Sequence, residues 1–260
     1  MENRDRMRDR FDREIEKMGV RIKDADNFKV EENVFDETTL LALYRLVHKG
    51  KLKVIGGSIS TGKEANVFYG EGEEFPLAIK IYRIQSANFR SISDYIIGDP
   101  RFSSIKRSKK DIIFAWTKKE YSNLSRALEA GIRVPRPVFF DRNILLIEFM
   151  GEDEIPYPQL RQAQIDDYTP VYASILSSMK TLFNEAGLVH ADLSEFNILF
   201  DGEEPIIIDI GQGVTPEHPK AIAFLVRDIK NINRYFNNKC PLREEEEIFC
   251  DIVGEHRMEF

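Results

Sequence analysis

One short segment combines residue types that could transfer a phosphoryl group. Residues 190–197 read His-Ala-Asp-Leu-Ser-Glu-Phe-Asn, which fits the pattern H-x-D-L-x-x-x-N at every fixed position. In that pattern the aspartate faces the attacking group and the asparagine binds metal, which assigns these roles to Asp192 and Asn197. Taken alone, Asp192 could equally be a turn carboxylate, because aspartate is common in turns.

A second carboxylate follows where a metal site would need it. Asp209 ends the apolar run Ile206–Ile208 and is followed by Ile210 and a glycine. Mg²⁺ prefers oxygen ligands and keeps several waters, so one carboxylate, one amide oxygen and ATP phosphates suffice. Asp209 alone could be a helix cap. Together with Asp192 and Asn197 it predicts a site for ATP and Mg²⁺, with Mn²⁺ as an alternative ion.

The segment Ser-Thr-Gly-Lys-Glu-Ala-Asn-Val resembles a phosphate-binding loop, and we expect its first four residues, Ser60, Thr61, Gly62 and Lys63, to contact the nucleotide. Only Gly62 keeps a glycine of the pattern G-x-G-x-x-G-x-V, although small residues still allow close backbone approach. Residues 57–64 also nearly fit the Walker A motif. That alternative fails because Glu64 replaces the required hydroxyl and because a strand pattern follows where a helix should begin.

A lysine and a glutamate in apolar surroundings are predicted to pair. Lys80 lies in the apolar run Leu77–Tyr82, and a buried lysine needs an anionic partner. Glu120 lies four residues after Trp116, on the apolar stripe of a predicted helix over residues 111–130. A Lys80–Glu120 pair would orient the α- and β-phosphates of ATP. The alternative is an exposed Glu120 at the edge of an amphipathic helix.

The adenine site is predicted where the apolar strand 144–149 ends. The backbone C=O of Glu148 and the N–H of Met150 stand just before a break marked by Gly151 and Pro156. We expect both groups to pair with adenine. An ordinary strand end is the alternative.

The order of elements predicts an α+β fold with two lobes. A small β-rich N-lobe with one long helix is followed by a mainly helical C-lobe that contains a hairpin, and a mostly helical segment precedes both. We expect the segment at 1–50, packing on the kinase domain, the N-lobe at 51–150 and the C-lobe at 151–260. Further predicted elements are strands at 138–140, 197–200 and 205–208, helices at 169–186, 217–236 and 242–258, and a long serine-rich mobile loop at 83–110.

The composition and charge of the chain favour some classes of binding partner and cellular compartment over others. Apolar residues make up 42% and charged residues 31%, with a net charge of −7, which argues against a general polyanion-binding surface and against sequence-specific DNA binding. A basic cluster at 101–110 is expected to be a solvated loop, or else a local contact to phosphate, RNA or an acidic partner. No membrane span or signal peptide is recognisable, and Cys240 and Cys250 fit no zinc or disulfide pattern, so we expect a cytoplasmic protein.

Three motifs in this order closely resemble the RIO family of atypical protein kinases, in its first subfamily. They are S-T-G-K-E-A-N-V at 60–67, H-A-D-L-S-E-F-N at 190–197 and I-D-I-G at 208–211. Residues 224–228 and Asn231 also look like that family. The resemblance spans about residues 50–240.

The resemblance implies a two-lobed protein-kinase-like fold with a truncated C-lobe and an extra N-terminal helical segment. It also implies the use of Mg-ATP, with Asp192 catalytic and Asn197 and Asp209 as metal ligands. It further implies that Asp209 can become a transient aspartyl phosphate, that the partner is the maturing small ribosomal subunit, and that members act as ATPase switches as well as serine kinases. The usual catalytic-loop lysine is absent and few residues follow Asp209, so we expect no ordinary peptide platform. Autophosphorylation of a serine at 86–108 is a further expectation. A small-molecule kinase and a pseudokinase scaffold are the alternatives.

Overall fold

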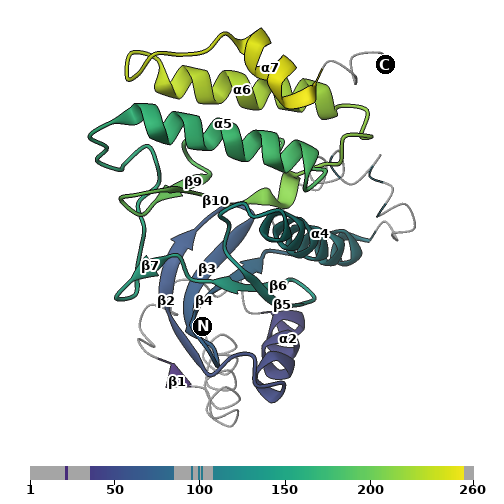
Figure 1. Cartoon of the computed structure of the whole chain (residues 1–260). Coiled ribbons are helices and arrows are strands. Elements are labelled where there is room, and N and C mark those ends of the chain that lie inside the picture. The colour runs from purple at the N-terminus through teal and green to yellow at the C-terminus, as the bar shows by residue number, and fades with distance from the viewer. Residues whose placement is uncertain are drawn as a thin grey trace. The chain divides into compact units, whose positions relative to one another are not determined.

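The computed structural model describes residues 21–22, 36–84, 95, 99, 101 and 108–254. The chain divides into two compact units (Figure 1). Unit 1 comprises residues 1–88, 108–117 and 137–150, and unit 2 comprises 89–107, 118–136 and 151–260. The lobe boundaries predicted above stay a proposal.

Unit 1 is built on a six-stranded sheet whose order is β1-β2-β3-β4-β6-β5. Its strands are β1 (Arg21–Ile22), β2 (Val54–Thr61), β3 (Ala65–Glu71), β4 (Pro76–Tyr82), β5 (Pro137–Asp141) and β6 (Ile144–Glu148). All neighbours are antiparallel except β1 and β2, which are parallel. Strand β1 lies in a segment that we predicted to be mostly helical; its pairing with Val54 and Ile55 cannot be recognised in a local pattern.

Helix α2 (Glu37–His48) supplies the core of unit 1 on one side of this sheet. Asp36 caps the helix by accepting the N–H of Thr39 at 2.8 Å. The buried face of α2 packs against β3, β4 and β6 through a cluster that includes Leu43, Leu46, Phe68, Ile79 and Leu146. Such burial stabilises the unit by roughly 1.5–3 kcal/mol for each large apolar side chain.

Unit 2 is mainly helical. It contains α5 (Tyr168–Asn184), α6 (Ala221–Phe236), α7 (Glu245–Val253), the end of α4 (Lys109–Glu129), the hairpin β9 (Ile198–Phe200) and β10 (Pro205–Ile207), the short pair β7 (Gly151–Glu152) and β8 (Ile155–Pro156), and the 3-10 helix η3 (Ile210–Gln212). Figure 1 shows α5, α6 and α7 stacked on one another, with the hairpin beside α5. The apolar stripes of α5 and α6 meet there, as at Tyr172 and Phe236, whose ring centroids are 5.1 Å apart.

Apart from β1, the types of the main helices and strands agree with the sequence predictions, whereas several ends differ for local reasons. Helix α5 is capped by Asp167, which accepts the N–H of Thr169, so it begins before the predicted Thr169 cap. Helix α6 begins at Ala221 instead of residue 217, because a turn at His218 precedes it. Helix α7 ends at Val253, where Gly254 adopts a φ of +76°. Most of the predicted loop 83–110 lies outside the described residues, as do residues 1–20, 23–35 and 255–260.

Candidate active site

The predicted catalytic loop lies between a backbone bridge and the hairpin of unit 2. Val189 pairs with Val214 through two backbone hydrogen bonds of 2.8 and 2.9 Å, and β9 begins directly after Asn197. The Asn197 side-chain N–H₂ group donates to the backbone oxygen of Asp192 at 2.8 Å and to its Oδ2 at 3.2 Å. Gln212 donates to the same Oδ2 at 3.1 Å. The structure therefore brings Asp192 and Asn197 together, as the motif predicted.

The hairpin also brings Asp209 to this loop. The N–H of Ile208 donates to the backbone oxygen of Asn197 at 3.0 Å, so the two predicted metal ligands are neighbours across the hairpin. Asp209 is exposed and adopts a left-handed backbone conformation with φ 61° and ψ 42°. A residue other than glycine in this region costs on the order of 1–3 kcal/mol and persists only where its surroundings fix it, typically at functional sites.

The donor set at this point fits Mg²⁺. The Asn197 nitrogen is engaged by Asp192, which leaves the amide oxygen to act as an acceptor, and the Asp209 carboxylate is exposed. Among the described residues no three His, Cys, Asp or Glu side chains gather around a common point. A site of one carboxylate, one amide oxygen and nucleotide phosphates, and not an all-protein cage, agrees with that finding.

Helix α6 holds the catalytic loop in place through three side chains. Asp228 is buried and accepts the N–H groups of Ala191 at 2.8 Å and Leu193 at 3.0 Å. Arg227 donates to the Ala191 oxygen, and Asn231 donates to the Leu193 oxygen at 3.1 Å. Ala191, like Asp209, has a positive φ, of 66°. These contacts fix the backbone on both sides of Asp192.

From the sequence, Arg227, Asp228 and Asn231 are only part of a family resemblance and have no predicted role. A signal was nevertheless present, because Asp228 falls on the apolar stripe between Leu225 and Ile232 of an amphipathic helix. A carboxylate in that position must find hydrogen-bond donors. The position on an apolar stripe that identified Glu120 therefore identifies Asp228 in the same way.

The electrostatics of the loop follow from burial. Burial raises the pKa of Asp228 to about 7, against the two backbone N–H groups that favour its charged form. Burial also raises the pKa of Asp192; Arg227 and Asn197 oppose that rise, and the charge of Asp209 adds to it. Burial lowers the pKa of His190 to about 4, so its ring is neutral at pH 7, and its Nε2 donates to the oxygen of Ile208 at 3.0 Å.

In unit 1, the predicted phosphate-binding residues form the tip of the β2–β3 hairpin. Ser60, Thr61, Gly62 and Lys63 are all exposed, and the N–H of Gly62 donates to the oxygen of Ala65 at 2.9 Å. A Cβ on Gly62 would lie 2.9 Å from that oxygen, so the turn requires glycine. Strand β3 follows directly, which excludes the helix that a Walker A motif needs.

Lys80 and Glu120 are both buried, as the predicted pair requires. Lys80 lies opposite Val67 and Leu145 in the middle of the sheet and is 8% exposed, and Glu120 is 1% exposed. The exposed alternative for Glu120 is therefore wrong. The two residues belong to different units, so their pairing stays a prediction. Glu148 ends β6 and Met150 follows it, as expected for the adenine-binding segment, whose role is likewise a prediction.

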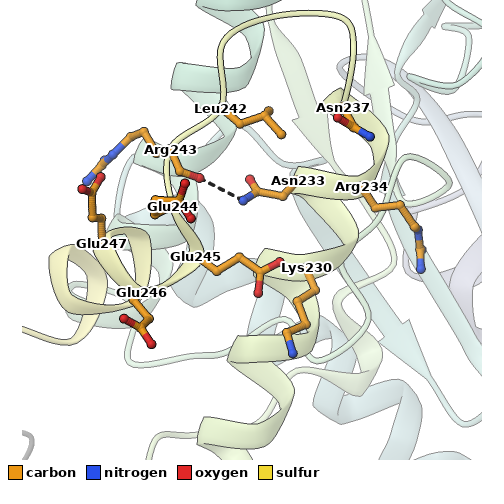
Figure 2. A pocket seen from close by; sticks show the side chains of 10 residues that line it. All are labelled: Lys230, Asn233, Arg234, Asn237, Leu242, Arg243, Glu244, Glu245, Glu246 and Glu247. Carbon is orange, nitrogen blue, oxygen red and sulfur yellow. Dashed lines mark hydrogen bonds between the residues drawn. The ribbon is translucent and has the colours of Figure 1, made fainter.

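A separate pocket of about 790 Å³ lies between α6 and α7 (Figure 2). Figure 2 shows four consecutive glutamates, Glu244–Glu247, on one side and Lys230 and Arg234 on the other. Asn233 donates to the backbone oxygen of Arg243 at 3.1 Å beside it. None of the residues that we predicted to bind nucleotide or metal lines this pocket.

Comparison with known proteins identifies the family. A model of the RIO domain matches residues 66–248. The chain belongs to the RIO domain family. The RIO-type serine/threonine-protein kinase Rio1 of Haloferax volcanii is 41% identical over 252 residues, which cover 96% of this chain and 87% of that protein. The protein of the same name from Methanocaldococcus jannaschii is 40% identical over 246 residues, covering 94% of this chain and 84% of its own length.

Membership of the RIO family confirms the predicted subfamily and the predicted enzyme class, an ATP-dependent phosphotransferase of the protein-kinase type. The solved Rio2 kinase from Chaetomium thermophilum, in a complex with ADP, Mg²⁺ and phosphoaspartate, has a TM-score of 0.65 at 23% identity and covers 84% of this chain and 67% of that chain. This likeness confirms the α+β kinase-like fold class. No helix among the described residues is long and apolar enough to cross a membrane.

Proposed function

We propose that this RIO protein transfers the γ-phosphoryl group of Mg-ATP, as an atypical serine kinase and ATPase, at a site made by Asp192, Asn197 and Asp209. The observation that carries the proposal is the arrangement of these residues: Asn197 donates to Asp192, and its backbone oxygen accepts the N–H of Ile208, the residue before Asp209. Phosphoryl transfer needs mainly positioning and charge stabilisation, which such an arrangement supplies.

Each residue has a distinct part in the proposal. Asn197 and Asp209 would hold Mg²⁺, which neutralises developing charge on the phosphates. Asp192 would accept the proton of the attacking hydroxyl or water. Burial raises the pKa of Asp192, which makes it a stronger base than an ordinary carboxylate. The Asn197 and Gln212 amides orient its Oδ2. Lys80, paired with Glu120, would orient the α- and β-phosphates.

The other residues proposed to bind nucleotide lie in unit 1. Exposed Ser60–Lys63 would approach the phosphates, and the backbone of Glu148 and Met150 would pair with adenine. The Rio2 complex with ADP and phosphoaspartate supports a covalent step at Asp209. In that step an Asp209 carboxylate oxygen attacks the γ-phosphorus, the bond to the β-phosphate oxygen breaks and ADP leaves; water then releases phosphate from the acyl phosphate.

The partner and substrate proposals rest on the family resemblance. We propose a cytoplasmic role in maturation of the small ribosomal subunit, with the chain itself as a phosphorylation substrate. Of the serines expected to accept phosphate, only Ser108 lies among the described residues; it caps α4 by accepting the N–H of Asp111 at 3.2 Å. The alternatives are a small-molecule kinase and a pseudokinase scaffold.

Nucleotide binding with and without Mg²⁺ tests the proposed site. Calorimetric titration of ATP should show that Mg²⁺ tightens binding to the wild type, whereas Asp209→Ala removes that gain and leaves metal-free binding intact. Asp201→Asn is the matched control, because Asp201 is a carboxylate of the same hairpin that pairs with Arg133. An equal Mg²⁺ effect in Asp209→Ala and the wild type would contradict the metal assignment.

Brief incubation with ATP labelled at the γ-phosphate tests the covalent step. An acyl phosphate on Asp209 is sensitive to hydroxylamine, whereas a serine phosphate is resistant. We expect part of the protein-bound label to be released by hydroxylamine and to be absent from Asp209→Ala. Label that is wholly resistant would leave the enzyme without an aspartyl phosphate. Phosphate release measured with and without ribosomal particles would then distinguish an ATPase switch from a protein kinase.

A further inference from the structure

Two buried polar side chains of α4 bind the loop that follows Asp209, and the proposed function gives them no role. Lys119 is fully buried, and its Nζ donates to the backbone oxygen of Gly211 at 2.9 Å and to that of Gly213. Asn123 is also fully buried, and its Nδ2 donates to the oxygens of Ile210 at 2.9 Å and Gly213 at 3.0 Å. The two side chains thus bind every carbonyl of residues 210–213 except that of Gln212.

The spacing of the two side chains on α4 fits the backbone of residues 210–213. Lys119 and Asn123 are four residues apart, so they lie on one face of the helix, one turn from each other. Gly213 lacks the side chain that would obstruct them: a Cβ there would lie 3.0 Å from the Asn123 Nδ2. Contacts this tight are rare for real Cβ atoms, so glycine allows the approach.

A lysine in this position is costly to the fold. Burial lowers the pKa of Lys119 to about 7; the charge of Asp99 opposes this and that of Arg101 adds to it. A buried methionine of similar length would avoid that cost, whereas a buried amine gives the loop charge-assisted hydrogen bonds. The arrangement continues beyond the loop, because Arg101 donates to the Asn123 Oδ1 at 2.9 Å and pairs with Asp99 at 2.7 Å.

Asp209 stands between two anchors. On its N-terminal side the N–H of Ile208 is bound to the oxygen of Asn197. On its C-terminal side Lys119 and Asn123 bind the carbonyls of 210–213. The left-handed backbone at Asp209 costs free energy for a residue other than glycine, and contacts such as these two anchors keep that conformation populated.

We propose that Lys119 and Asn123 are positioning residues for Asp209: by holding the carbonyls of 210–213 they fix the backbone that presents its carboxylate to the metal. The inference rests on the proposed role of Asp209 as a metal ligand. Residues that orient a metal ligand typically change metal affinity by about 10- to 100-fold when they are replaced.

Lys119→Met tests the proposal in the full chain, with Lys118→Met as the matched control because Lys118 is the exposed neighbour on the same helix. Mn²⁺ binding in the presence of ADP is followed by electron paramagnetic resonance of the free ion. We expect the dissociation constant for Mn²⁺ to rise at least about tenfold in Lys119→Met, while ADP binding without metal changes less than about twofold. Hydrogen exchange of the amides of 208–214 should also become faster in the metal-free variant. Lys118→Met should match the wild type in all three measurements.

Asn123→Leu is the second variant, because it removes the hydrogen bonds that Asn123 donates to the loop without removing a buried charge. It should weaken Mn²⁺ binding and accelerate exchange in the same way, so it tests the positioning role by itself if Lys119→Met does not fold. Unchanged Mn²⁺ affinity and exchange, or equal weakening of Mn²⁺ and metal-free ADP binding, would overturn the positioning role. Asp209→Asn is measured in parallel. If it binds Mn²⁺ as the wild type does, the proposed function fails; if it loses Mn²⁺ while the other variants keep it, only the positioning role fails.

Discussion

Replacing Asp228 with asparagine should change the pH dependence of stability in a predictable direction. The folded chain raises the pKa of this carboxyl from its ordinary value of 3.8 to about 7 through burial. Between about pH 4 and 7 the folded chain therefore keeps a proton that the unfolded chain has released. The stability contributed by that proton is complete below the unfolded pKa and is lost as pH rises through about 7.

The magnitude follows from the size of this rise. At 1.36 kcal/mol for each pH unit, the loss amounts to roughly 4 kcal/mol in total, of which roughly 3 kcal/mol falls between pH 5 and 8. Asparagine does not titrate, so its variant lacks this loss. Asparagine also offers one oxygen to the two N–H groups of Ala191 and Leu193, and one buried donor left without an acceptor costs about 1–3 kcal/mol at any pH.

Urea unfolding of the wild type and Asp228→Asn at pH 5, 6, 7 and 8 measures the difference. We expect the variant to be less stable by about 1–3 kcal/mol at pH 5 and the gap to close or reverse by pH 8. A difference that stays constant across this range would show that the pKa of Asp228 is not raised in the folded chain.

Asp201→Asn is the control for these measurements. Burial raises the pKa of Asp201, but its bonds to the N–H groups of Glu204 and Glu203 and to Arg133 outweigh burial and leave that pKa lowered. Stability from a lowered carboxyl pKa is present above the unfolded value and is lost only as pH falls below it. The difference between Asp201→Asn and the wild type should therefore be constant from pH 5 to 8.

Three further predictions concern separate parts of the chain. Because burial raises the pKa of Asp192, the acid limb of the kcat profile should lie above pH 3.8, and stopped assays between pH 4 and 8 would locate it; a rate that stays flat down to pH 4 would contradict this. Lys80→Ala should weaken productive phosphate placement more than adenine binding, so KM for ATP should rise more than the dissociation constant of adenosine; equal changes would argue against a phosphate contact. Tyr172→Phe should lower the unfolding free energy by about 1–2 kcal/mol, because the Tyr172 hydroxyl donates to Asn233 at 2.7 Å and accepts the N–H of Arg243. Thermal unfolding measures this loss, and an unchanged midpoint would show that the two hydrogen bonds contribute nothing to stability.

Local sequence was enough to predict the parts of the site that are close together in the chain. Asp192 and Asn197 are recognised by their spacing within one loop. Asp209 is recognised as the carboxylate that ends an apolar strand. Each pattern needs only a few consecutive residues. The alternating and apolar runs of unit 1 likewise predict strands, because side-chain burial sets the period of the pattern.

The supporting contacts could not be predicted in the same way, since they join residues far apart in sequence. Asp228 binds Ala191 and Leu193, and Lys119 binds Gly211 and Gly213, across 35 or more positions. Each of these polar side chains interrupts the apolar stripe of its helix and can be recognised for that reason. The helical pattern does not predict which carbonyl or N–H group the side chain binds. The parallel pairing of β1 was missed because two residues carry no periodicity.

Single-turnover release of phosphate by the wild type and Asp192→Asn tests the proposed catalytic role of Asp192. Each protein is held in excess over Mg-ATP labelled at the γ-phosphate, and the formation of labelled free phosphate is followed by rapid quench, with Asp201→Asn as the control carboxylate. We expect Asp192→Asn to bind Mg-ATP within about twofold of the wild type but to transfer the phosphoryl group to water at least about 10²-fold more slowly, while Asp201→Asn is unaffected. Equal transfer rates in the wild type and Asp192→Asn would contradict the catalytic role of Asp192.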